Sequence, residues 1–175
     1  RRALAIAPDS VDLRPDLGVA LQAQGRLEEA AETYRHALTL APDFADALCN
    51  LGIALQAQGR LEEAVETYRR ALALSPHVAD IHNNLGTALR AQARLTEAVA
   101  CYRRAVALAP DHGLAHINLG VALHALQRFD DAIASFRQGV ALNPNDAEAH
   151  NGLGTALLAG REPIEAMECF LRAIV

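Results

Sequence analysis

Apolar residues recur along this chain in pairs of helical stripes, and the pair repeats every 34 residues. In one such unit, Leu48, Leu51 and Leu55 form the first stripe, and a second stripe follows within residues 61–72. Spacings of three and four residues predict two amphipathic helices. The polar turn at 58–60 between them is too short for anything but an antiparallel hairpin.

Five columns of residue types keep the same period, which identifies an internal repeat. A leucine–glycine pair, an alanine, an aromatic residue and a proline recur in every unit, and the proline ends the second helix. The glycines mark places where two helices approach closely. The proline and aromatic columns are Pro8, Pro42, Pro76, Pro110 and Pro144, and Tyr34, Tyr68, Tyr102, Phe136 and Phe170.

The period predicts an all-α chain that forms one solenoid of helical hairpins. We expect complete repeats at 11–44, 45–78, 79–112 and 113–146. Residues 1–10 resemble the end of a truncated repeat, and residues 147–175 resemble a repeat without its tail. We therefore expect the sequence to be an excerpt of a longer array, because solenoids need polar capping helices at their ends.

Charged residues are arranged along the second helices in a way that favours the helix dipole. These helices begin with acidic residues such as Glu62 and Glu63, and arginines such as Arg69 and Arg70 lie toward their ends. Polar residues after the prolines are candidate N-caps of the next first helix. These candidates are Asp9, Asp43, Asp111 and Asn145.

Composition narrows the function classes. The net charge is −5 and all sixteen basic residues are arginine, which argues against nucleic acid and anionic membranes as partners. No apolar run is long enough to span a bilayer, and no secretory signal opens the sequence. Cys49, Cys101 and Cys169 lack a disulfide or metal spacing, which indicates free thiols and a cytoplasmic location.

One face of the first helices carries the candidate binding residues. Asparagine precedes the leucine–glycine pair in three successive repeats, although it is a mediocre helix former. Its amide offers one acceptor and two donors, enough to clamp a peptide group. The alternative is that these amides bond a neighbouring helix or face water. The predicted peptide-binding residues are Asn50, Asn84, Asn118, Asp46, Asp80, Asn83, Thr87, Gln56 and Arg90.

No pattern indicates catalysis, a cofactor or a metal. His82, His116 and His150 occupy one column, so they lie on the order of 10 Å apart and cannot share an ion. We expect them to have packing roles. The glycine pair Gly152 and Gly154 lies within a predicted helix with no strand before it, which excludes a phosphate loop.

The repeated columns resemble those of the tetratricopeptide repeat family over the whole chain. That resemblance implies a right-handed superhelix whose first helices line a concave groove. The stretches ADALCNLG, ADIHNNLG and GLAHINLG resemble the repeat region of O-linked N-acetylglucosamine transferases. In that family an asparagine ladder holds the backbone of an extended substrate, and Asn50, Asn84 and Asn118 match it. The family's acidic ladder is matched by Asp46 and Asp80.

Three functions are weighed on these grounds. The first is a protein-interaction scaffold, with no enzymatic activity of its own, that binds an extended peptide or partner segment. The second is the substrate-recruiting part of a glycosyltransferase whose catalytic domain is not in this chain. The third, a clamp for chaperone tails, is disfavoured because the chain has no lysine. We also expect end-to-end association between copies through the uncapped termini.

Overall fold

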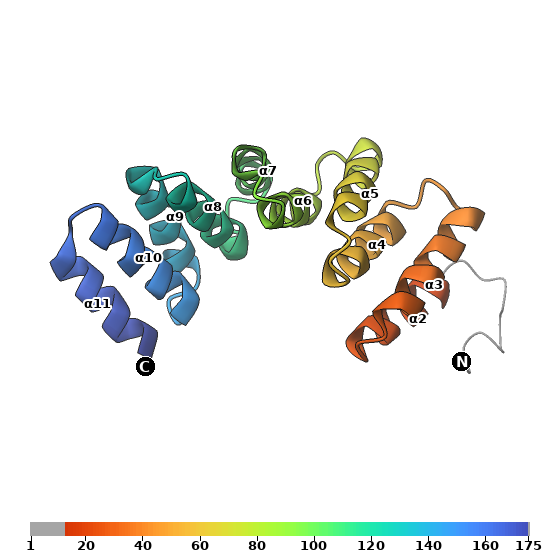
Figure 1. Ribbon diagram of the computed structural model, residues 1–175, viewed down its shortest axis with the longest axis horizontal. Helices are drawn as coiled ribbons and strands as arrows, with labels where there is room; N and C mark the ends of the chain where they lie inside the picture. The colour runs from red at the N-terminus through yellow and green to blue at the C-terminus, as the bar shows by residue number, and fades with distance from the viewer. Residues whose placement is uncertain (1–12, 175) are drawn as a thin grey trace. The chain divides into compact units, whose positions relative to one another are not determined.

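The computed structural model describes the backbone of residues 13–174 and the side chains of residues 16–174. Every regular element in that part of the chain is an α-helix (Figure 1). The predicted fragment at 1–10 and the candidate cap Asp9 lie outside the described residues. The helices are α2 (Leu13–Ala23), α3 (Leu27–Leu40), α4 (Ala45–Ala57), α5 (Leu61–Leu74), α6 (Ala79–Ala91), α7 (Leu95–Leu108), α8 (Gly113–Ala125), α9 (Phe129–Leu142), α10 (Ala147–Ala159) and α11 (Pro163–Ile174).

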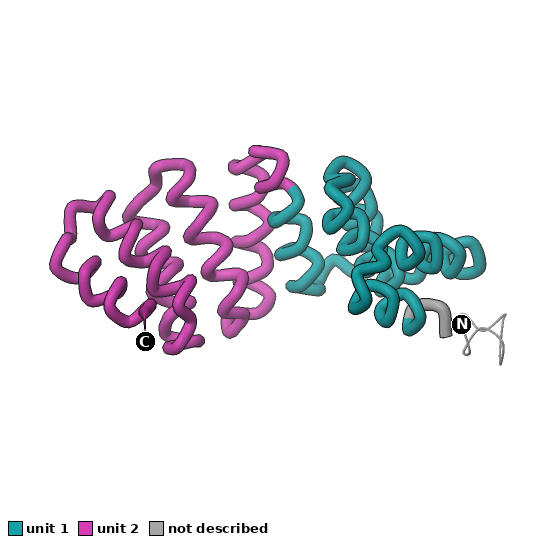
Figure 2. The backbone as a smooth tube through the Cα atoms, turned by 60° about the horizontal axis from the view of Figure 1, so that its bottom comes forward, with its two compact units in different colours: residues 1–88 teal, residues 89–175 magenta. Residues whose placement is uncertain are grey.

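The chain divides into two compact units, residues 1–88 and 89–175, with the boundary inside α6 (Figure 2). In the first unit α2 packs on α3, α3 on α4 and α4 on α5. In the second unit α7 to α11 pack consecutively in the same way. First helices also touch across a repeat, α2 against α4 and α8 against α10. The predicted all-α fold of helical hairpins is confirmed.

Each hairpin turns through one residue with a left-handed backbone. Gly25 and Gly59 have φ of 74° and 75° and close the first two hairpins. Later turns use Ala93, Gln127 and Arg161 at φ of 59° to 68°. A left-handed non-glycine residue costs roughly 1–2 kcal/mol, so the later turns are held by the packing of the helices they join.

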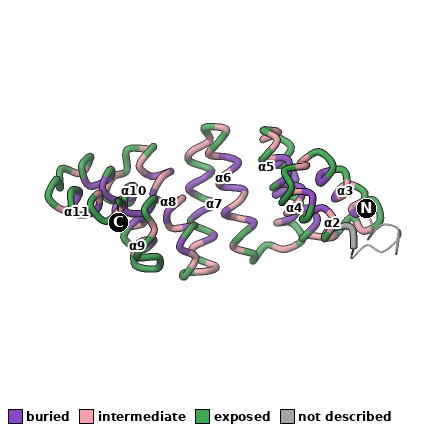
Figure 3. Tube along the Cα trace, turned by 90° about the horizontal axis from the view of Figure 1, so that it is seen from below, coloured by how far each residue is buried: buried purple, intermediate pink, exposed green. Residues whose placement is uncertain are grey.

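An aromatic ring fills the centre of each hairpin. Tyr34, Tyr68, Tyr102 and Phe136 are at most 2% exposed. Buried positions alternate with exposed ones along the helices (Figure 3). The rings fit because the opposing first helix has a glycine. An added Cβ at Gly52 would lie 2.5 Å from Cε1 of Tyr68. The close approach that the glycine column predicted is therefore between the backbone of the first helix and the aromatic ring of the second helix.

The outer face of α11 differs from the equivalent faces before it. Met167 is 59% exposed, whereas the residues at its position in the four preceding repeats are all buried. Ile164 and Ile174 on the same helix are 75% and 82% exposed. The buried equivalents of Met167 are Ala31, Val65, Val99 and Ile133.

Two expectations about helix ends were wrong. The N-caps of α4, α8 and α10 are Phe44, His112 and Asp146, each one residue after the predicted position. Of these, Asp146 makes a strong cap, since its carboxylate accepts from Ala149 N at 3.0 Å. The arginines do not compensate the dipole of the second helices, because none lies in the last turn of α3, α5, α7 or α9. Residues such as Arg137 instead form ion pairs with the next repeat.

Candidate functional site

The predicted binding face is best defined in the first unit, where α4 and α6 come together. Nδ2 of Asn84 lies 3.9 Å from Sγ of Cys49, which places the third-repeat amide beside α4. Burial raises the pKa of the Cys49 thiol, the Asn84 bond opposes this, and the charges of Asp46 and Asp80 raise it further. These four side chains therefore share one small region of the surface. The thiol stays protonated, so Cys49 is not an activated nucleophile.

The asparagines of the predicted ladder are partly accessible. Asn50 and Asn84 are half-buried on α4 and α6 in the first unit. Asn50 makes no side-chain hydrogen bond with another described residue, so its amide is available to a ligand. Asn118 occupies the same column on α8 in the second unit and is also half-buried.

Acidic and apolar residues flank these amides. Asp46 and Asp80 lie in the first turns of α4 and α6 and are exposed. One turn beyond Asn50, Ile53 is 38% exposed, and Val19 at the equivalent position of α2 is 50% exposed. The face thus combines amide groups with negative charge and apolar surface.

Gln56 has a structural partner. Its Oε1 accepts from the hydroxyl of the buried Tyr68 at 3.4 Å, and Gln22 accepts from Tyr34 in the preceding hairpin. These bonds connect the ends of α2 and α4 to the centres of their own hairpins. Gln56 therefore contributes to packing, which its place in the column did not reveal.

The remaining predicted residues differ in exposure. Asn83 is only 5% exposed, so its amide is not on the accessible face. The half-buried Thr87 donates its hydroxyl to the carbonyl of Asn83 at 3.0 Å. Arg90 lies near the end of α6, beyond the unit boundary, and its Nε is buried without a hydrogen-bond partner among the described atoms.

The histidine column has a packing role, as its spacing predicted. Nε2 of His82, His116 and His150 lies 3.0, 2.9 and 2.8 Å from the carbonyl oxygen of the proline six residues earlier. Each bond fastens a first helix to the turn that precedes it. Within residues 16–174, no group of three histidine, cysteine or acidic side chains could hold a metal ion.

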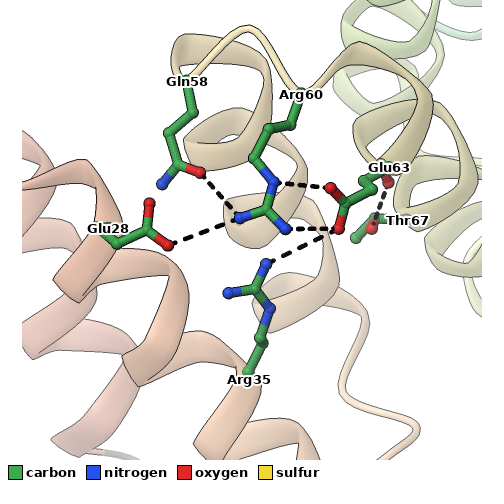
Figure 4. A network of polar contacts seen from close by, with 6 residues as sticks. All are labelled: Glu28, Arg35, Gln58, Arg60, Glu63 and Thr67. Carbon is green, nitrogen blue, oxygen red and sulfur yellow. Dashed lines mark hydrogen bonds and ion pairs between the residues drawn. The ribbon is translucent and has the colours of Figure 1, made fainter.

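A network of ion pairs on the second helices was not anticipated. An arginine just before the second helix binds the acidic residue three positions later in four repeats, as Arg60 does with Glu63 at 2.7 Å. Arg60 also lies 3.6 Å from Glu28, and Arg35 lies 4.0 Å from Glu63 (Figure 4). These last two pairs join the first and second repeats. The recurrence of the arginine was visible in the sequence, but its partners were not.

The comparisons with known proteins agree with this architecture. Sequence profiles of the tetratricopeptide repeat match residues 21–59, 43–111, 77–145 and 125–175. Among curated proteins, none matches at a significant level. Within the described residues, no helix is both long and apolar enough to cross a membrane.

Solved structures with the same fold cover nearly the whole chain. MamA from Desulfovibrio magneticus RS-1 is 23% identical, with a TM-score of 0.86 over 95% of this chain and 94% of that one. YrrB, described as a TPR protein with an unusual peptide-binding site, is 23% identical, with a TM-score of 0.78 over 99% and 89%. PilF of Pseudomonas aeruginosa is 28% identical, with a TM-score of 0.84 over 93% and 76%. Since the matched profiles together extend from residue 21 to residue 175, the chain belongs to the tetratricopeptide repeat family.

Proposed function

We propose that this chain is a non-catalytic interaction scaffold that holds an extended peptide of a partner protein by its backbone. The proposal depends most on the region shared by α4 and α6. There Asn50 and Asn84 offer partly exposed amides on neighbouring first helices, and Asn84 is fixed beside Cys49. The description of YrrB as a peptide-binding TPR protein supports the same class of function.

The geometry of an extended ligand fits this arrangement. Packed helices are on the order of 10 Å apart, and an extended chain advances about 3.3 Å per residue. Within the first unit, Asn50 and Asn84 would therefore meet ligand residues about three positions apart. An amide can accept from a peptide N–H and donate to a carbonyl, so it binds without reading the side chain.

The residues beside the amides favour a ligand of particular chemistry. Asp46 and Asp80 are exposed and negatively charged, and Ile53 presents apolar surface one turn away. A peptide with basic and aliphatic side chains complements such a face. Peptides rich in acidic residues would be repelled.

A displayed library of random peptides supplies the probe for a direct test. A selected peptide is synthesised and titrated calorimetrically into the wild-type protein and into the variant carrying N50A, N84A and N118A. Loss of three sets of hydrogen bonds is expected to weaken binding by at least about tenfold. The melting temperature should change little, because these amides are partly exposed. N145A, in an exposed turn, is the matched control and should bind normally. Equal affinity of the triple variant and the wild type would show that the asparagines do not form the clamp.

A second candidate is the substrate-recruiting part of an O-linked N-acetylglucosamine transferase. The asparagine and aspartate columns of residues 45–52 and 79–86 favour it, since both resemble that family's ladders. The candidate is supported if the gene that encodes these residues also encodes a glycosyltransferase domain, and it is rejected if the gene does not.

A further inference from the structure

A stripe of large apolar side chains on the outer face of α11 has the spacing of a coiled-coil seam. Its members follow one another at intervals of three, four and three residues, which are the a and d positions of the heptad pattern. Each is between 59% and 82% exposed, so little of the described chain covers the stripe. The opposite side of the helix is buried at Ala166 and Cys169, and α11 packs on α10 (Figure 1). The stripe consists of Ile164, Met167, Leu171 and Ile174.

Two positions of the stripe are polar in every preceding repeat. In the first unit Glu28 lies 3.6 Å from a guanidinium group of the next hairpin, and Arg35 lies 4.0 Å from one of its carboxylates. At these two positions α11 has Ile164 and Leu171. A further hairpin of the same pattern would therefore meet apolar side chains where it needs ion-pair partners, and the stripe suits an apolar helix face instead. The corresponding residues of the other repeats are Glu62 and Arg69, Thr96 and Arg103, and Asp130 and Arg137.

The two edges of the stripe differ in chemistry. At 3.6 residues per turn, Glu168 and Arg172 lie along one edge of it and Phe170 lies along the other. Both charged side chains are exposed, and neither forms a salt bridge within residues 16–174. Phe170 is half-buried, although the aromatic residues at its position in the preceding repeats are at most 2% exposed. The apolar surface of α11 therefore extends toward Phe170 and ends at a pair of opposite charges.

We propose that α11 is the interface of a homodimer, in which the stripe packs antiparallel against the stripe of a second copy about a two-fold axis. The order of the four residues suits this arrangement. Ile164 then lies opposite Ile174 of the second copy, and Met167 lies opposite its Leu171. Both copies bury the same surface, so the contact is complete with two copies and does not extend into a fibre.

The edges of the stripe favour the antiparallel orientation. A two-fold axis that crosses the helices brings like edges together, so Glu168 of each copy faces Arg172 of the other and the two Phe170 edges meet. Two ion pairs result, and the charges of the interface are complementary. In a parallel pair the charged edge of one helix would meet the Phe170 edge of the other, and its carboxylate would lose water without gaining a partner.

Sedimentation equilibrium of the 175-residue chain tests the apolar seam. The wild type should form a reversible dimer and no larger species as its concentration rises. L171R restores the arginine of the preceding repeats and should weaken dimerisation by at least about tenfold, because it puts a charge into the seam. Leu158 of α10 is 51% exposed, so L158R adds the same charge away from the stripe and should leave the dimer intact. Thermal unfolding followed by circular dichroism checks that both variants are folded.

Charge reversal tests the orientation of the two helices. E168R puts an arginine opposite Arg172 of the second copy, and R172E puts a glutamate opposite Glu168. Each variant alone should therefore dimerise at least about fivefold more weakly than the wild type. An equal mixture of the two variants regains both ion pairs, and it should form a heterodimer about as tightly as the wild type forms its homodimer.

Four results would each overturn the proposal. They are a wild type that stays monomeric at high concentration, oligomers that keep growing beyond two copies, a dimer that survives L171R, and a mixture of E168R and R172E that associates no better than either variant alone. The mixing experiment compares variants whose changes lie on exposed positions, so it separates lost recognition from lost folding.

Discussion

Replacing Gly52 by alanine puts a methyl group against the ring of Tyr68. The new Cβ would lie 2.5 Å from Cε1 and 2.8 Å from Cδ1 and Cζ, well inside the roughly 3.5–4.0 Å at which carbon atoms attract. The ring cannot move into solvent, because Tyr68 is 0% exposed and its hydroxyl is bonded to Gln56. Overpacking of this kind typically costs about 1–3 kcal/mol, while alanine gains up to ~1 kcal/mol of helix propensity. We predict a net loss of roughly 1–2 kcal/mol.

Urea unfolding followed by circular dichroism measures this loss in a double-mutant cycle. G52A is compared in the wild type and in a Y68L background, where the atoms nearest the new methyl group are removed and the alanine should be tolerated or stabilising. G160A is a useful control, since its nearest contact is the flexible end of Ile133 at 3.1 Å. If G52A stabilises the protein, or if its effect is the same with and without the ring, the close contact does not explain this glycine.

Three further predictions rest on how far individual side chains are buried or exposed. Burial raises the pKa of the Tyr34 hydroxyl from 10.0 to about 12. The stabilisation that the neutral phenol contributes is therefore fully present below pH 10 and is lost as the pH rises toward 12. Ultraviolet titration of the hydroxyl, with unfolding curves recorded at the same pH values, checks this. H150A should lower the unfolding free energy by about 1–3 kcal/mol, since it removes a 2%-exposed ring and strands a proline carbonyl, and H82A should lower it less, because that ring is half-buried. If copies associate through the outer face of α11, M167E should reduce association in sedimentation velocity; a wild type that stays monomeric at high concentration would exclude it.

The fold followed from the sequence because its determinants are periodic. A proline column, a glycine column opposite an aromatic column and two stripes per unit leave little freedom in where helices begin and pack. The caps were harder to place. Phe44 and His112 occupy positions where a sequence rule expects a small polar residue, and packing of the hairpin overrides that preference.

The site was only partly accessible to the same reasoning. A column shows which residues recur, but it does not show which partner each side chain meets. When the sequence is drawn as a helix, Gln56 and Asn83 lie on the same face as the asparagines of the ladder. In the structure, however, Gln56 bonds Tyr68 and Asn83 is buried. Likewise, the arginines of the second helices seemed to serve the dipole, while Arg35 and Arg137 in fact reach acidic residues of the next repeat. Contacts between repeats depend on the angle at which hairpins stack, and a single sequence does not report that angle.

The central claim is that a partner's backbone is held by asparagines of the first helices. A selected peptide can be resynthesised with single N-methyl groups along its backbone, which remove one N–H donor at a time and leave every side chain in place. Isothermal titration of each version should show loss of affinity by about tenfold at positions roughly three residues apart, and little change between them. The same positions should be insensitive to methylation in the variant that lacks Asn50, Asn84 and Asn118. Affinity that is unaffected by every N-methyl group, but is lost when ligand side chains are changed to alanine, would contradict the account.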